Sequence, residues 1–139
     1  MPRLKKEHII NWFKEGEKKR EDWKIGTEHE KFVFHLNNLE RAGYFGKSGI
    51  SELLNNLAKE NNWEKVLENN NIIGLKDETG ASISLEPGGQ LELSGSPLEN
   101  LHQTCKETGK HLQIMKKAIN KLGLSMIGLG SVSYTHLRA

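Results

Sequence analysis

The sequence predicts an α+β domain in which a β-sheet packs against helices. Two observations support this: short stretches of alternating apolar residues within residues 23–94, and a later segment whose apolar residues recur every three or four positions. A helix with one apolar side must lie along an apolar surface, and the back of the sheet is the simplest candidate. At 139 residues, the chain has the length of one domain.

The N-terminal part predicts an amphipathic helix followed by a strand. The apolar residues of the helix recur at helical spacing before Gly16: Leu4, Ile9, Trp12 and Phe13. Segment 23–36 then alternates aromatic and β-branched residues, which is typical of a strand. Side chains alternate along a strand, so Glu28 and Glu30 are expected on one face. His29 is expected on the other face, packed or hydrogen-bonded rather than bound to a metal.

The middle of the chain predicts a short helix and several strands. The helix is expected over residues 50–57, with Ser48 as its cap. The Asn-rich segment 55–71 is expected to be helical, with polar connections. Three strands, separated by turns at 77–80 and 87–89, are expected at 72–76, 82–86 and 90–93.

The last part of the chain predicts a long helix of about seven turns, by the 3.6-residue period, and a further strand. Ser96 is expected to cap this helix, Glu99 completes the capping box, and Gly123 stops it. The apolar stripe of the helix includes Cys105, which is therefore expected to be buried and slow to react. A strand is expected to begin at Leu124.

Carboxylates occupy two of the expected strand segments. Glu28 and Glu30 lie in the first, and Glu86 and Glu92 flank the turn Pro87-Gly-Gly89 in the second. Taken alone, such residues are more often a solvated strand face and an ordinary turn. If the strands meet in one sheet, however, several desolvated carboxylates would repel one another, and Mg²⁺ would relieve this repulsion. The paired glycines would let backbone N–H groups approach an anionic ligand, so the pattern indicates phosphate chemistry.

The composition excludes some classes of protein. Lys and Arg total 20 against 18 Asp and Glu, and the charges are interleaved, so no basic stripe for nucleic acid is present. The single cysteine excludes an internal disulfide framework and favours a reducing compartment. No apolar run approaches the ~20 residues of a membrane span, and no secretory signal is recognisable. The protein is therefore expected to be cytoplasmic.

Long stretches of the chain closely resemble the plant-type glutamate–cysteine ligases (γ-glutamylcysteine synthetases) of plants and many proteobacteria. The matching segments include Ile25-Gly-Thr-Glu-His-Glu-Lys-Phe32, Ser82-Ile-Ser-Leu-Glu-Pro-Gly-Gly-Gln90 and Glu92-Leu-Ser-Gly-Ser-Pro-Leu-Glu99. The resemblance implies a glutamine-synthetase-like fold, in which an antiparallel sheet forms a funnel with helices outside. It also implies ATP-dependent ligation of glutamate to cysteine through γ-glutamyl phosphate, the first step of glutathione biosynthesis.

The resemblance also assigns roles to residues of this chain. It implies Mg²⁺ as the cofactor, held by Glu28, Glu30, Glu86 and Glu92. Gly88, Gly89 and Gln90 are expected near ATP and the amino-acid substrates. A cysteine in the region of Cys105 forms a regulatory disulfide in some members of the family, so Cys105 is a candidate redox residue.

Two departures from the family limit these expectations. Family members are much longer, so residues 1–130 are expected to be the N-terminal part of a catalytic domain, inactive alone and able to self-associate through an open sheet edge. Residues 131–139 differ from the family and resemble a foreign tail. Two alternatives remain open: another γ-glutamyl carboxylate–amine ligase of the same fold, or a non-catalytic fragment.

Overall fold

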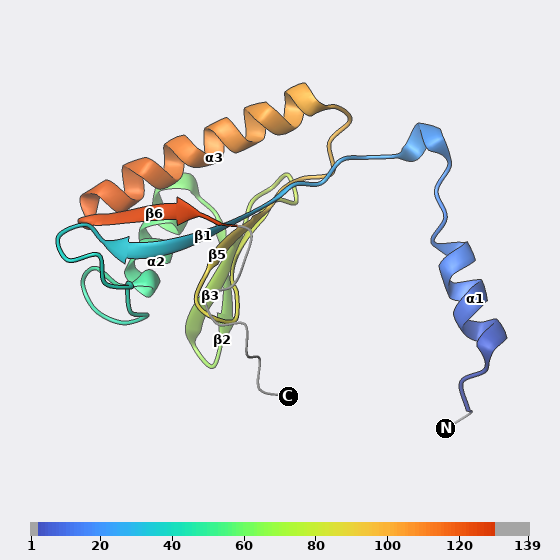
Figure 1. The fold of residues 1–139 in the computed structure, drawn as a ribbon, viewed down its shortest axis with the longest axis horizontal. Coiled ribbons are helices and arrows are strands. Elements are labelled where there is room, and N and C mark those ends of the chain that lie inside the picture. Colours follow the sequence, from blue (N-terminus) through green and yellow to red (C-terminus); the bar gives the residue numbers. More distant parts are fainter. Residues whose placement is uncertain (1–2, 130–139) are drawn as a thin grey trace.

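A computed structural model describes residues 3–129, which form a six-stranded antiparallel sheet in the order β2-β3-β4-β5-β1-β6. Figure 1 shows the long helix α3 running along the sheet, while α1 stands away from it. The α+β class is therefore confirmed. The elements are α1 Lys6–Glu15, the 3₁₀ turn η1 Arg20–Asp22, β1 Glu28–His35, α2 Ile50–Asn61, β2 Glu64–Glu68, β3 Asn71–Lys76, β4 Ser82–Leu85, β5 Leu91–Ser94, α3 Leu101–Lys121 and β6 Leu124–Gly128.

The core lies between the sheet and the helices α2 and α3. Its fully buried side chains come from both helices and from three strands: Leu53, Leu54, Leu57, Leu75, Leu91, Met115 and Leu124 among the largest. In contrast, α1 buries none of its residues, and Trp12 and Phe13 are exposed. The predicted amphipathic helix therefore forms without packing on the described sheet.

The expectation that residues 55–71 are helical is wrong beyond Asn61. Asn62 ends α2 in the left-handed conformation, with φ of +56°. Residues 64–68 then form β2, which pairs with β3 through a tight turn at Asn69 and Asn70, whose φ values are +48° and +63°. Two successive positive φ values are typical of a type I′ hairpin turn, and asparagine tolerates them well. This Asn-Asn pair was the available signal for the missed strand.

The predicted caps of both core helices are also wrong. Asn100, not Ser96, caps α3, and its side-chain oxygen accepts a hydrogen bond from the Gln103 N–H at 3.1 Å. Ser96 is occupied elsewhere, because its N–H donates to Glu107 at 2.8 Å. The cap of α2 is Gly49 rather than Ser48. Glycine fits this position because a Cβ there would lie 2.6 Å from the carbonyl oxygen of Phe45.

The apolar stripe predicted for α3 is correct only in part, since Leu112 is 43% exposed even in the C-terminal half. Met115 and Ile119 are buried as expected, but Leu101 is 68% exposed and Cys105 is exposed, so the expected burial of this thiol is wrong. The N-terminal half instead turns polar residues inward: Thr104, Glu107, Thr108 and His111. Two of these residues have partners outside the helix: Glu107 accepts from Ser96 and Thr108 contacts His29 of β1, so these contacts rather than hydropathy hold them inward.

The six strands form an open sheet with β2 and β6 at its edges. The funnel implied by the resemblance therefore stays a prediction. Within the described range, no helix is both long and apolar enough to cross a bilayer. The expected foreign tail, residues 131–139, lies outside the described residues.

Candidate functional site

The strand register brings three of the four predicted carboxylates onto one face of the sheet. Glu30 lies directly opposite Glu92 in the β1–β5 pair, and Glu28 lies opposite Ser94. The neighbouring side chain His29 points to the other face, where its Nε2 is 3.1 Å from Oγ1 of Thr108 in α3. Because side chains alternate along a strand, Glu28, Glu30 and Glu92 must occupy the face opposite α3. We call this the acidic face.

Glu86 joins the acidic face at the turn that follows β4. Its carboxylate accepts a hydrogen bond from Ser84 at 2.8 Å, and Ser84 lies opposite Glu92 in the β4–β5 pair. The turn closes through two backbone bonds of 2.8 Å, from Gly89 N–H to the Glu86 carbonyl and from Glu86 N–H to the Gln90 carbonyl. Gly88 and Gly89 have φ of +96° and +76°, which only glycine adopts at low cost.

Gln90 connects this turn to the acidic face. The side chain is 1% exposed, and its Nε2 donates to Oε2 of Glu30 at 2.8 Å. Ser94 similarly donates to Glu92 at 3.0 Å. Neutral donors therefore hold one oxygen of each of these carboxylates in place. The predicted metal and substrate residues thus belong to the neighbouring strands β1 and β5 and to the turn between β4 and β5.

The acidic face suits a hard cation that is completed by external oxygens. Like charges directly opposite each other on neighbouring strands destabilise a sheet, and Glu30 and Glu92 form no ion pair within residues 3–129. In the same range, no three acidic, His or Cys side chains are grouped to hold a metal ion unaided. Mg²⁺ commonly binds one or two carboxylates together with water and substrate phosphates, which fits this donor set.

A polar cluster of His29, Lys31 and His111 lies between the sheet and α3, on the face opposite the acidic face. The sequence did not identify this cluster. Lys31 is 5% exposed, and its Nζ donates to the carbonyl of His29 at 3.0 Å. Burial lowers the pKa of Lys31 from its usual value. Burial, with the nearby charges of Lys31 and His29, lowers the pKa of His111 to about 4. His111 is therefore neutral at pH 7.

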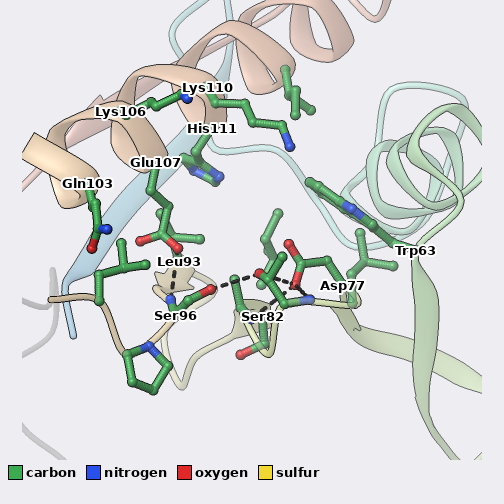
Figure 2. Close-up of a pocket in the computed structure, with 17 residues that line it drawn as sticks. Trp63, Asp77, Ser82, Leu93, Ser96, Gln103, Lys106, Glu107, Lys110 and His111 are labelled. Carbon is green, nitrogen blue, oxygen red and sulfur yellow. Dashed lines mark hydrogen bonds between the residues drawn. The ribbon is translucent and has the colours of Figure 1, made fainter. Parts of the chain in front are cut away.

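A pocket of about 450 Å³ lies beside this cluster, between α3 and strands β3 to β5. Figure 2 shows Lys106, Lys110 and His111 from α3 on one side, and Trp63 and Asp77 on the other. The inner wall is apolar and includes Leu75, Ile83, Leu93 and Ile114. The pocket opens on the α3 side of the sheet, so it is separate from the acidic face.

Glu107 forms the link between α3 and the strand that carries Glu92. Its Oε1 accepts the Ser96 N–H, and a Cβ on Gly95 would overlap its Oε2. The same Cβ would lie 2.9 Å from Oγ1 of Thr27, just before β1. Gly95 therefore lets α3 approach the ends of β1 and β5, which hold Glu28 and Glu92. No sequence pattern signalled this contact, because Glu107 resembles any other charged residue on a helix.

Comparison with known proteins gives a consistent result. The sequence model of glutamate-cysteine ligase family 2 matches residues 24–139. The chloroplastic glutamate–cysteine ligase of Medicago truncatula is 50% identical over 127 residues, which cover 91% of this chain and 24% of the relative. The enzymes from Arabidopsis thaliana and Oryza sativa subsp. japonica (ligase A) are 48% and 47% identical over the same length. The chain therefore spans about a quarter of the relatives' length.

The names of these relatives correct one expectation. All three are described as chloroplastic, which contradicts the expected cytoplasmic location. That expectation depended on the single cysteine and on the absence of a recognisable secretory signal or membrane-spanning run. A low cysteine content distinguishes reducing from oxidising compartments. It does not distinguish one reducing compartment from another.

Proposed function

Because the chain belongs to glutamate-cysteine ligase family 2, we propose that it supplies the cation-binding part of an ATP-dependent ligase. The proposed reaction joins the γ-carboxylate of glutamate to the amine of cysteine through γ-glutamyl phosphate, the first step of glutathione biosynthesis. The observation that carries this proposal is the pairing of Glu30 with Glu92 on a face that also holds Glu28 and Glu86. We further propose that this face lines a glutamine-synthetase-like funnel of the kind that the family resemblance implies.

The proposed role of the acidic face is to hold the cation and to orient the reacting phosphate. Glu28, Glu30, Glu86 and Glu92 are the proposed ligands of Mg²⁺, which would neutralise charge on the phosphate oxygens. Gln90 keeps the carboxylate of Glu30 in one orientation through its 2.8 Å hydrogen bond. Preorganised charge of this kind needs little rearrangement during the reaction, and this lowers the barrier to phosphoryl transfer.

A chimaeric enzyme can test the proposed function. This segment would replace the matching 127 residues of the Medicago truncatula ligase, and phosphate release from ATP would be followed. We expect turnover only when both glutamate and cysteine are present. The variant Glu92→Gln should lose most of this turnover, because one proposed ligand is removed. Glu21→Gln is the matched control, since Glu21 is an exposed acid in η1, outside the acidic face.

The same assay separates the alternatives. Turnover with another amine in place of cysteine would indicate a different ligase of the same fold. Full activity of the Glu92→Gln chimaera at ordinary Mg²⁺ concentration would contradict the metal assignment. The 139-residue chain alone should release no phosphate in response to the two amino acids.

A further inference from the structure

We propose that Arg41 and the backbone N–H of Gly88 form an oxyanion site at the end of the acidic face, and that its ligand is the phosphate chain of a nucleotide. The inference rests on the proposed function, which requires ATP. It adds a cationic contact to a site that otherwise consists of carboxylates and amides.

Backbone pairing puts Arg41 on the acidic face. Arg41 lies opposite Phe34 in an isolated antiparallel bridge. Two hydrogen bonds flank this pair, from His35 N–H to the Glu40 carbonyl at 2.8 Å and from Ala42 N–H to the Val33 carbonyl at 3.0 Å. Residues directly opposite in such a pair share a face of the sheet. Phe34 is an even number of residues from Glu30 along β1, so Arg41 shares the face of Glu30.

The guanidinium group of Arg41 lies directly against the glycine turn. A Cβ on Gly89 would overlap Nη2 of Arg41 and lie 3.0 Å from its Cζ. The next residue, Gln90, donates to Glu30. The cationic group therefore lies beside the turn residue that precedes Gln90, the residue bonded to Glu30. The positive φ of +76° favours glycine at position 89, and a larger residue there would also displace the guanidinium of Arg41.

The guanidinium is available for an external anion. Every ion pair in the described part of the chain uses a lysine, so Arg41 pairs with none of the nearby carboxylates. Arg41 and Gly88 are both exposed, and Gly88 N–H has no acceptor within residues 3–129. A guanidinium fork beside a free backbone N–H is a favourable arrangement for phosphate or carboxylate oxygens.

The neighbouring charges favour phosphate over carboxylate. A free carboxylate ligand would be repelled by Glu30, Glu86 and Glu92. A polyphosphate chain can instead bind Mg²⁺ at the acidic face with some of its oxygens and Arg41 with others. One ligand would then satisfy both the carboxylates and the guanidinium.

Binding of inorganic triphosphate to the 139-residue chain provides the test. The titration would follow the amide NMR signals of Gly88 and Gly89, with and without Mg²⁺. We expect Arg41→Gln to weaken binding about tenfold, because a charge-assisted contact is lost. Arg20→Gln, which removes the same charge from exposed η1, should bind like the unaltered chain. Unfolding temperatures of the variants would confirm equal folding.

Three outcomes would overturn the inference: no binding by the unaltered chain, equal weakening by Arg20→Gln and Arg41→Gln, or unchanged binding by Arg41→Gln. A parallel titration with L-glutamate distinguishes the two anions. If Arg41→Gln weakens only glutamate binding, the ligand is a carboxylate and the nucleotide assignment fails.

The variant Glu30→Gln separates this inference from the proposed function. Loss of the Mg²⁺ dependence in Glu30→Gln, with unchanged triphosphate binding by Arg41→Gln, would refute the oxyanion site and leave the metal assignment intact. The opposite result, in which only Arg41→Gln weakens binding, would support the oxyanion site and refute Glu30 as a metal ligand.

Discussion

Acid should destabilise this fold through His111. The side chain is 6% exposed, and its Nδ1 has no hydrogen-bond partner among residues 3–129. It faces Lys31 and His29 from β1, and Glu107 lies one helical turn away on α3. Protonation would place a second cation beside buried Lys31, so the folded protein resists it. The test is therefore to lower the pH and to compare the stability of the unaltered chain with that of a variant that lacks the His111 imidazole.

The size of the effect follows from the shift in pKa. The pKa of His111 falls from 6.5 to about 4 in the folded protein. Above pH 6.5 the folded and unfolded chains both hold His111 neutral, so the free energy of unfolding is unaffected. Below pH 6.5 the unfolded chain binds the proton first, and stability falls until the pH reaches about 4. At pH 5 the loss from this group is about 2 kcal/mol.

Urea unfolding at pH 7.5 and pH 5 would measure this loss. In His111→Gln, the difference in unfolding free energy between the two pH values should be smaller by about 2 kcal/mol. His102→Gln provides the control, because His102 is exposed on the outer side of α3. If His111→Gln loses as much stability as the unaltered chain, the burial argument is refuted.

Three further predictions concern α3 and its contacts. Gly95→Ala should lower the free energy of unfolding by about 1.5–3 kcal/mol, because its Cβ displaces Glu107 from the Ser96 N–H; an unchanged urea midpoint would contradict this contact. Gly109→Ala should instead stabilise by about 0.5–1 kcal/mol, since its Cβ meets nothing within 4 Å in the helix interior; destabilisation would show an unrecognised close packing there. Cys105 should react with a bulky aromatic disulfide at the rate of a free thiol, with Cys105→Ser as the blank; slow labelling would indicate that the exposed side of α3 is covered in solution.

The layout of the acidic face could be predicted from the sequence. Alternation along a strand is a local property with a period of two residues, so Glu28 and Glu30 must share a face wherever that strand lies. The Pro87-Gly-Gly89 turn was equally readable, because few residues other than glycine adopt positive φ cheaply. The register that sets Glu30 opposite Glu92, in contrast, comes from the long-range β1–β5 pairing, which the sequence left as a condition.

The surroundings of α3 depended on the tertiary structure. Ser96 satisfies the local rules for a helix cap, yet its N–H donates to Glu107, a residue of the helix that it was expected to start. Cys105 satisfies the helical spacing but is exposed, whereas Thr108 and Glu107 turn inward to contact His29 and Ser96. Arg41 meets Gly89 across 48 positions of the sequence. Such contacts depend on where distant segments meet in space, and no local period or propensity records that.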